Sequence, residues 1–458
     1  MAYSSVTKPE DYFNTKLYSG TGSSQAITGV GFQPDWVWIK SRSDALSHAL
    51  FDSIRGTTKV LNSNANTAEY TNTDTLTAFG TDGFTVGSNT GVNASGETRV
   101  SWNWIAGGTA PAITYVVKVV SDSGNNYRFD DFGTSAVTLE LQEGGTYTFD
   151  QSDSSNSGHP LRFYTASDKT GGEYTTGVTT TGTPGSSGAQ TVITVAASAP
   201  TLYYQCSNHA GMGGQANTNS LFGSSNFSGS TQSTVSANTT AGFSIVSYTG
   251  TGANATVGHG LGSVPQWIIT KDRDNSNQWY VYHVGIGNTH GLRLSTTDAK
   301  DDDATLWNDT TPTSSVFSVG SNTGTNRSAN PIIAYCFADK TGYSKFSSYT
   351  GNGNADGAFI YTGFKPALTI IKNSGSTGPW YLFDNKRPGF NVINVEITAN
   401  SSDSEATDVS LDFLSNGFKL RKTGTGVNGD GNSYIYMAFA ENPFVANDSG
   451  TVVPSTAK

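Results

Sequence analysis

The chain has 458 residues, a length that predicts three or four domains rather than one. Its net charge of −10 argues against a nucleic-acid partner, because such binding needs a basic surface that displaces phosphate counterions. Aromatic residues reach 11% and charged residues only 14%. Short aromatic and β-branched runs separated by Gly, Asn and Ser are typical of an all-β protein. No apolar run of about 18 residues occurs, so no membrane insertion is expected.

The first segment, residues 1–16, reads "MAYSSVTKPEDYFNTK" and is predicted to be an N-terminal arm. It lacks the apolar centre of a secretion signal. We therefore expect a protein made in the cytoplasm, and any surface destination would be reached by another route than a signal peptide.

Three similar segments follow, at residues 17–110, 243–341 and 342–446. They open with "LYSGTG", "SYTGTG" and "SYTGNG", and each continues to an apolar strand that follows a proline. The prolines are Pro34, Pro265 and Pro366, and six residues after each stands a lysine: Lys40, Lys271 and Lys372. Each segment ends in a related strand, "VSWNWIAGG", "IIAYCFADK" or "YIYMAFAEN", whose letters place Trp104, Cys336 and Ala438 at one equivalent position. Matches that recur in the same order identify an internal repeat.

Each repeat is predicted to form a small two-layer β-sandwich with jelly-roll or lectin-like topology. Cys336 is expected to be a buried core thiol, and the tryptophans of the repeats to be core rather than sugar-stacking residues. With only two cysteines, a disulfide framework is not expected.

Repeats 1 and 2 are separated by an insertion. Residues 111–217 contain their own alternating strands and are predicted to be a separate β-sandwich. Residues 218–242 are rich in Ser, Thr, Asn and Gly and are predicted to be a linker, or an extended strap. Residues 447–458 are predicted to be a C-terminal tail.

The insertion contains one stretch of specific chemistry, "YYQCSNHAGMGG", which places Cys206, His209 and Met212 at a Cys-x2-His-x2-Met spacing. A thiolate, an imidazole and a thioether on one short loop are ligands that copper prefers. This stretch and the upstream "YTFDQSDSSNSGHPLRF" resemble the cupredoxins, a Greek-key β-sandwich family. The resemblance implies that His159, Cys206 and His209 are equatorial copper ligands and that Met212 is the axial one. Bound copper, another ion such as zinc, and no metal all stay open.

The sequence departs from the cupredoxin pattern in one respect. Members of that family often carry an asparagine directly after the upstream histidine, whereas this chain has Pro160. Residues outside the ligand set orient the ligands, so this change puts the bracing of the metal loop in doubt.

The repeats, in particular "KPEDYFNTKLYSG" and "GVGFQPDWVWIKSR", resemble virion structural proteins of marine bacteriophages, notably cyanophages. The resemblance implies a non-enzymatic protein of the virion surface, either a tail fibre or appendage or a capsid-decorating knob. Its partners would be other virion proteins and a host surface glycan, and a fibre would be a homotrimer. Two alternatives remain: a copper-binding redox module anchored by the repeats, and a polysaccharide depolymerase. No G-x-S-x-G, H-E-x-x-H or Walker sequence occurs, so an enzyme is not expected.

Overall fold

The computed structural model describes residues 4–108, 110–220 and 222–443. The C-terminal tail predicted at residues 447–458 lies outside these residues. The described chain is built almost entirely of β-strands arranged in several separate sheets, which confirms the predicted all-β, multi-sandwich fold. No helix of the described residues is long and apolar enough to cross a membrane.

Repeat 1 contains a four-stranded sheet and a three-stranded sheet. The larger has the order β1 (Phe13–Ser19), β9 (Thr98–Trp104), β3 (Trp36–Ser41) and β4 (Ala49–Asp52), and the smaller has β2 (Gln25–Thr28), β8 (Gly83–Val86) and β7 (Leu76–Gly80). Short elements complete the repeat: η1 (Pro9–Asp11), β5 (Lys59–Val60), β6 (Tyr70–Thr71) and α1 (Thr90–Asn93).

Repeat 2 has the same topology but a longer sheet. Its large sheet has the order β19 (Ser224–Asn226), β20 (Ser233–Asn238), β21 (Phe243–Thr249), β28 (Pro331–Phe337), β23 (Trp267–Asp272), β24 (Tyr280–His283), β25 (His290–Arg293) and β26 (Asp301–Asp302). The small sheet pairs β22 (Ala255–Gly258) with β27 (Val316–Val319), and two short helices, α2 (Ala304–Trp307) and α3 (Thr323–Asn326), lie beside it in sequence.

Repeat 3 again has two sheets in the same order. The larger has β29 (Ser344–Thr350), β36 (Ser433–Pro443), β31 (Phe364–Asn373), β32 (Trp380–Asp384) and β33 (Ile397–Thr398), and the smaller has β30 (Phe359–Tyr361), β35 (Gly417–Leu420) and β34 (Leu411–Leu414).

The segment predicted to be a linker or an extended strap, residues 218–242, contains two strands of its own, β19 and β20. Its strands β19 and β20 extend the sheet of repeat 2, with Ser233 to Asn238 paired along β21. Ser and Thr have short side chains that fit an edge strand as well as a loop, so composition alone did not separate the two.

The last strand of the repeat is aligned differently from the sequence expectation. The partner of Trp36 is Trp104, whereas the equivalent residue of repeat 2, Trp267, pairs with Phe337. Asn103, and not Trp104, is therefore the counterpart of Cys336. A shift of one residue turns each side chain to the opposite face of a strand, and aligned letters do not reveal such a shift. Cys336 is fully buried in the core of its own repeat, as expected, and burial raises the pKa of its thiol.

The three repeats close into a ring with approximate threefold symmetry. The equivalent lysines are fully buried, and each ammonium group donates to a backbone carbonyl of a different repeat. The bonds run from Lys40 to Ser402 (3.2 Å), from Lys271 to Asn66 (3.3 Å) and from Lys372 to Thr297 (3.2 Å). Repeat 1 thus contacts repeat 3, repeat 2 contacts repeat 1, and repeat 3 contacts repeat 2. A head-to-tail contact that returns to its starting unit is a closed ring.

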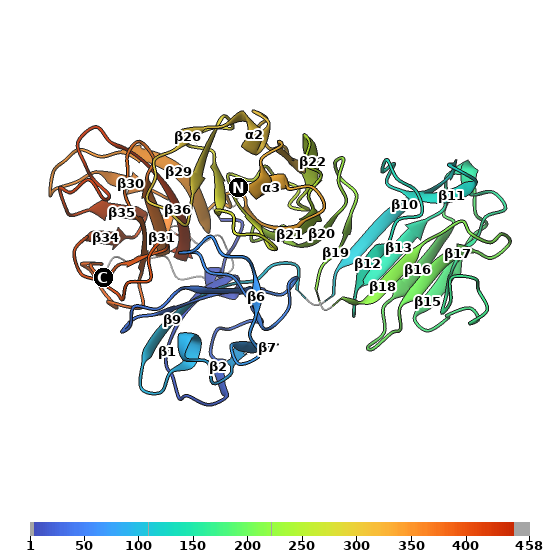
Figure 1. Cartoon of the computed structure of the whole chain (residues 1–458), viewed down its shortest axis with the longest axis horizontal. Helices are drawn as coiled ribbons and strands as arrows, with labels where there is room; N and C mark the ends of the chain where they lie inside the picture. The colour runs from blue at the N-terminus through green and yellow to red at the C-terminus, as the bar shows by residue number, and fades with distance from the viewer. Residues whose placement is uncertain (1–3, 109, 221, 444–458) are drawn as a thin grey trace.

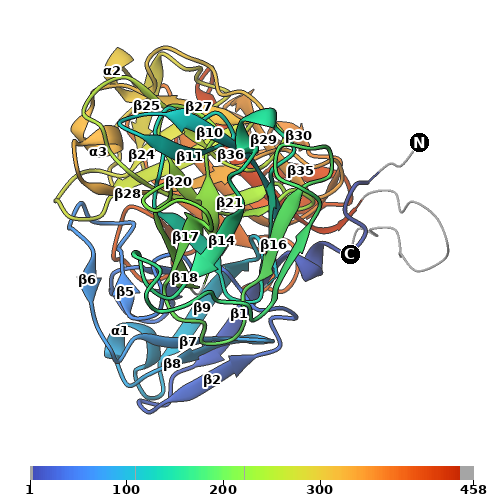
Figure 2. The same cartoon turned by 90° about the vertical axis from the view of Figure 1, so that its right-hand side faces the viewer.

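Backbone hydrogen bonds repeat the same cycle. They run from the Glu405 amide to the Arg42 carbonyl (3.0 Å), from Glu69 to Arg273 (2.7 Å) and from Lys300 to Ser374 (3.1 Å). We call the three contact zones the 1–3, 1–2 and 2–3 seams after the repeats that they join. Figures 1 and 2 show repeat 1 below the other two.

The large sheets of all three repeats contribute to one central hydrophobic core. The Trp36 ring lies 4.5 Å from that of Tyr335 in repeat 2, and the rings of Phe13 and Phe337 lie 5.2 Å and 6.0 Å from Phe439 in repeat 3. The tryptophans of the repeats are buried, as expected. Each repeat also has a smaller core between its own two sheets. The ring therefore holds together through apolar packing at its centre, and its seams are polar.

A buried asparagine explains the repeated turn sequences. In repeat 2 the Asn326 side chain donates to the carbonyls of Gly320 (2.8 Å) and Ala253 (2.6 Å) and accepts from the amide of Thr251 (2.7 Å). Asn93 and Asn428 make the corresponding bonds in repeats 1 and 3. The asparagine thus joins the turn after the first strand to the segment before the last one.

We expect Asn326→Ala to destabilise repeat 2 by about 3 kcal/mol, because it removes three hydrogen bonds at about 1 kcal/mol each and leaves the buried Gly320 carbonyl without its donor. Thermal unfolding measures the loss of stability, and hydrogen exchange shows whether the loss lies in repeat 2. Asn254→Ala, at an exposed position of the same repeat, is the matched control and should change stability by less than about 0.5 kcal/mol. Equal effects of the two substitutions would contradict the role given to Asn326.

The inserted sandwich projects from one side of the ring (Figure 1). One sheet has the order β11 (Asn125–Phe129), β10 (Ala112–Ser121), β13 (Thr146–Asp150), β16 (Gln190–Thr194) and β15 (Val178–Thr181). The other has β12 (Leu139–Gln142), β18 (Gln215–Ser220), β17 (Leu202–Cys206) and β14 (Leu161–Tyr164), and η2 (Ser154–Asn156) connects β13 to β14. The two sheets enclose a core of their own.

Candidate metal centre

The candidate ligands lie at the end of the inserted sandwich that is remote from the ring. Strand β10 leads away from the ring and pairs in parallel with β13, so the connection from β13 to β14, which contains His159, lies at the far end. Strand β18 leads back toward the ring and is antiparallel to β17, so the loop between them, residues 207–214, also lies at the far end. The topology therefore brings His159 to Cys206, the last residue of β17, and to the loop that carries His209 and Met212.

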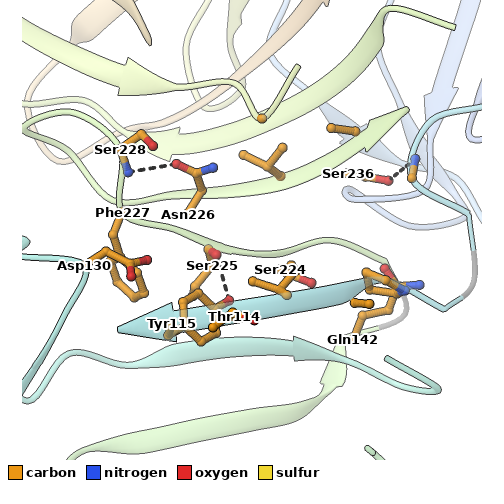
Figure 3. Close-up of a pocket in the computed structure, with 17 residues that line it drawn as sticks. Thr114, Tyr115, Asp130, Gln142, Ser224, Ser225, Asn226, Phe227, Ser228 and Ser236 are labelled. Carbon is orange, nitrogen blue, oxygen red and sulfur yellow. Dashed lines mark hydrogen bonds between the residues drawn. The ribbon is translucent and has the colours of Figure 1, made fainter. Parts of the chain in front are cut away.

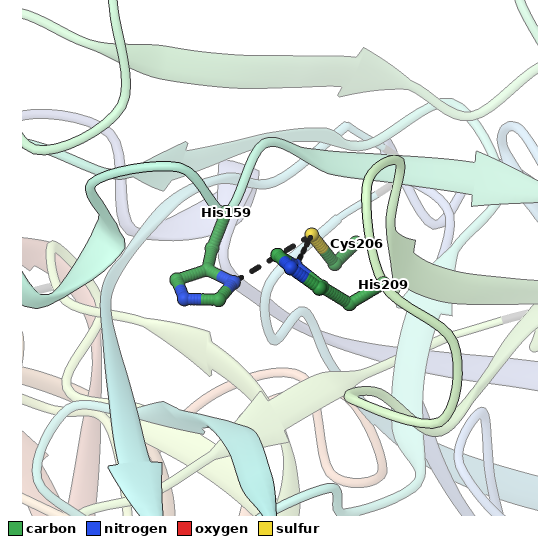
Figure 4. Close-up of side chains that lie close together, drawn as sticks. All are labelled: His159, Cys206 and His209. Atoms are coloured by element: carbon green, nitrogen blue, oxygen red, sulfur yellow. Dashed lines mark hydrogen bonds between the residues drawn. The ribbon is translucent and has the colours of Figure 1, made fainter.

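Three of the four predicted ligands form a compact cluster (Figure 4). The Cys206 sulfur lies 3.5 Å from Nδ1 of His209 and 3.8 Å from Nδ1 of His159. One ligand atom from each of the three residues lies within 4.8 Å of the others. A thiol and two imidazole nitrogens at this spacing can converge on one ion.

The three side chains differ in exposure. Cys206 is fully buried, His159 is half-buried and His209 is exposed. Partial burial, together with the neighbouring His209, lowers the pKa of His159 and so favours the neutral imidazole that a metal requires. The exposed His209 leaves one side of the cluster open to solvent.

Met212, the predicted axial ligand, is buried in the same hydrophobic core as Cys206. Its carbonyl accepts a hydrogen bond from the Tyr127 amide (2.8 Å), which ties the end of the ligand loop to β11. The structure thus places the thioether residue inside the sandwich beneath the loop, next in sequence to the exposed Gly211.

The backbone of His159 is held from two sides. Its carbonyl accepts from the Tyr127 hydroxyl (2.8 Å) and from the Gln151 amide (2.9 Å). Gln151 is itself buried and accepts from the Leu161 amide (3.1 Å). These bonds fix the position from which the His159 ring extends.

The ligand loop is braced by residues that the sequence reasoning did not identify. The Lys169 ammonium donates to the carbonyls of Cys206 (3.1 Å), Ser207 (3.2 Å) and His209 (3.4 Å). Asn208 donates to the Gly158 carbonyl (2.9 Å). Lys169 lies about 40 residues upstream in a surface turn, and no motif marks it, so only the structure reveals it.

The two ligand loops are joined across Pro160, where the sequence departs from the cupredoxin pattern. Pro160 accepts at its carbonyl from the Ser207 amide (3.0 Å), beside the bond from Asn208 to Gly158. The asparagine that would brace the loop from the histidine side is absent, but Asn208 braces it from the cysteine side. The ligand loop is therefore braced in this chain, although Pro160 replaces the asparagine that cupredoxins often carry.

Gly213 is required by the tight return of the loop. A Cβ atom at this position would lie 1.7 Å from the Tyr204 carbonyl oxygen, closer than any side chain can approach. The glycine therefore allows the loop to turn directly over β17, which keeps His209 and Met212 near Cys206.

A cavity of about 410 Å³ lies between the inserted sandwich and repeat 2 (Figure 3). Its walls come from the start of β10 and from β19 and β20, with Asp130 at one end. Phe227, which directly follows β19, is buried in the core of the inserted sandwich, with its ring 5.4 Å from that of Tyr115. The β19–β20 hairpin therefore pairs with the sheet of repeat 2, and its Phe227 packs in the core of the inserted sandwich. The hairpin connects the inserted sandwich to repeat 2.

The fold defines an all-β protein of three sandwich repeats with a fourth sandwich inserted between the first two. The chain belongs to the family described as Domain of unknown function (DUF7483), whose model matches residues 8–138 and 215–443. The matched stretches leave out residues 139–214, which carry all four candidate ligands, so family membership does not bear on the metal site. No curated protein and no solved structure matches the chain.

Proposed function

We propose that this chain is a non-enzymatic protein of a bacteriophage virion surface, in which the ring of repeats serves as a rigid body that displays the inserted sandwich. The observation that supports this most is the closure of the three repeats around one core, with a single sandwich projecting from them. Such a body suits attachment to other virion proteins on one side and contact with a host surface glycan on another. The bacteriophage assignment itself rests on the sequence resemblance.

Labelling purified particles with a gold-coupled antibody against the inserted sandwich tests the location. We expect gold on the tail or on the capsid of intact particles, and the two positions separate a fibre or appendage from a decorating knob. Particles that carry no label and contain no peptide of this chain by mass spectrometry would refute the proposal.

The closed ring also bears on oligomeric state. A tail fibre would be expected to be a homotrimer, but here one chain already supplies three equivalent units, and each seam is occupied within the chain. We therefore propose that trimers do not form through these seams. Mass photometry of the purified protein should give a monomer, or an oligomer whose formation is insensitive to seam substitutions.

We propose as a second function that the inserted sandwich binds copper. This rests on the cluster of Cys206, His159 and His209, with Met212 buried under the same loop. When bound, copper would supply one-electron redox chemistry, and the protein would hold the thiolate and the imidazoles in fixed positions. Zinc in the same site would supply no redox chemistry.

The brace formed by Lys169 should tune this site. We expect Lys169→Met to weaken copper binding about tenfold, because the carbonyls of the ligand loop lose their common donor and the loop becomes less ordered. Competition with a chelator of known affinity measures the change. Lys118→Met, on the same sandwich but paired with Asp131, is the control and should leave the affinity unchanged.

A further inference from the structure

Two buried histidines lie at seams of the ring, and both seams belong to repeat 3. His48 in repeat 1 points Nε2 at the Thr398 carbonyl of repeat 3 (3.1 Å). His283 in repeat 2 points Nε2 at the Tyr436 carbonyl of repeat 3 (3.3 Å). Both side chains are fully buried. They occupy different positions of the repeat, because His283 ends β24 whereas His48 precedes β4.

The hydrogen-bond partners fix both imidazoles in the neutral form. Nδ1 of His48 accepts from the Trp38 indole N–H (2.7 Å), and Nδ1 of His283 accepts from the Gly285 amide (2.9 Å). Each ring can therefore donate only from Nε2, to repeat 3. A second proton would have to sit on Nδ1, where it would face another N–H group in the protein interior.

We propose that His48 and His283 form an acid-sensitive latch, which holds repeat 3 against repeats 1 and 2 at neutral pH and releases it on acidification. Protonation of either ring replaces an accepted hydrogen bond with a donor–donor contact and adds a buried charge. Separation of the seam gives the charged ring access to water, so the open ring is favoured in acid.

The charged groups around His48 strengthen the effect. Lys40 on β3 and Arg387 of repeat 3 both disfavour a positive imidazole, and Arg387 is paired with Asp384. The pKa of His48 is lowered to about 3, with burial as the largest cause and the two cations adding to it. His283 packs edge-on against Trp267, its partner in repeat 3 is the Tyr436 backbone carbonyl, and burial lowers its pKa to about 3 as well.

These shifts define the pH window. The unfolded or opened chain binds the two protons near pH 6.5, whereas the closed ring binds them only near pH 3. The open form therefore carries more protons between these values, and the stability of the closed ring falls as pH falls from about 6.5 toward 3. Above pH 6.5 the contribution of the latch is complete.

The 1–2 seam has different contacts, and for this reason we expect repeat 3 to be released while repeats 1 and 2 stay together. Its described residues include no histidine at the equivalent contacts. There Trp279 donates to the Asn62 carbonyl (2.9 Å), Tyr335 donates to Asp52 (2.6 Å) and Arg273 pairs with Glu69 (2.8 Å). Burial would raise the pKa of Glu69, but its bonds to Arg273 and Arg55 outweigh burial and lower it. This seam should thus persist to a lower pH than the two that hold repeat 3.

A double variant, His48→Gln/His283→Gln, tests the latch, because glutamine keeps one donor and one acceptor and does not titrate. Small-angle X-ray scattering is followed from pH 7 to pH 3, and pepsin cleavage of the wild type and the variants is compared at the acidic end of this range, where the protease is active. For the wild-type chain we expect expansion in this range, with the first cleavages releasing repeat 3. In the double variant the midpoint should move down by about one pH unit.

His259→Gln is the matched control. His259 is also fully buried with a lowered pKa, about 4, but it bonds to Thr313 within repeat 2 and not across a seam. We expect its scattering midpoint to follow the wild type. The proposal is overturned if the double variant opens at the wild-type midpoint, or if His259→Gln shifts that midpoint equally.

A measurement on the unmodified protein keeps the proposal testable should the double variant fail to fold. Carbon-13 labelled histidine gives separate NMR signals for the imidazoles. We expect the His48 and His283 signals to stay neutral until the ring opens and then to change together with the scattering. Titration of either ring near pH 6.5 in a protein that remains closed would overturn the latch.

Discussion

Replacement of Cys206 by serine should remove copper binding from the protein. The wild-type chain, loaded with copper and oxidised, is expected to bind one ion and to show the strong red-light absorption of a copper–thiolate bond. Cys206 is the sole thiol in the ligand cluster, so its loss removes the absorption band and weakens copper binding by more than about 100-fold. Metal analysis of the dialysed protein and its visible spectrum check both effects.

The chain supplies a matched control in its second cysteine. Cys336 is buried in repeat 2 and aligns structurally with Ala438 of repeat 3, so Cys336→Ala introduces the residue that another repeat already carries. This variant should keep both the metal and the spectrum. If wild-type protein takes up no copper, or if Cys206→Ser retains it at wild-type affinity, the copper proposal fails while the virion proposal is untouched.

The second large effect is expected at the centre of the ring. Trp36 is almost completely buried, and its ring contacts Trp104 of its own repeat and Tyr335 and Phe243 of repeat 2. We expect Trp36→Ala to cost about 3–5 kcal/mol, because a large cavity opens where the repeats meet. Hydrogen exchange should show lost protection in repeats 1 and 2 together.

Trp307→Ala separates this shared core from a local one. Trp307 is equally buried but belongs to the core between the two sheets of repeat 2. The loss of stability should be similar in size, with lost protection concentrated in repeat 2. If Trp36→Ala affected repeat 1 alone, the central core would not couple the repeats as the ring requires.

The sequence by itself determined those features that depend only on neighbouring residues. Alternating strands, the three ordered copies and the Cys-x2-His-x2-Met spacing all lie within short windows, so fold class and candidate ligands could be predicted from them. His159 was also found, because the inserted segment contains a single upstream histidine. The structure places it beside Cys206, as the cupredoxin resemblance implied.

Only the tertiary structure decided the features that depend on distant partners. Lysine side chains usually lie at the surface. Lys40 is buried because the Ser402 carbonyl, some 360 positions away in the chain, helps to accept the hydrogen bonds of its ammonium group. The strands at 224–226 and 233–238 could not be predicted from composition. They form because β20 pairs with β21 and β19 pairs with β20. Lys169 braces the metal loop without any motif that marks it. The register of the last strand was misaligned by one residue, because apolar letters recur on both faces of a fully buried strand.

The physical reason is the same in each case. Local conformation follows from the chemistry of neighbouring residues, and it is written in the order of the sequence. Ring closure, edge pairing and seam contacts follow from which surfaces meet, and the free energy of those contacts is shared between residues far apart in the chain. The sequence by itself therefore determined the four sandwich units and the candidate metal ligands. The packing of the units determined that the three repeats form one body.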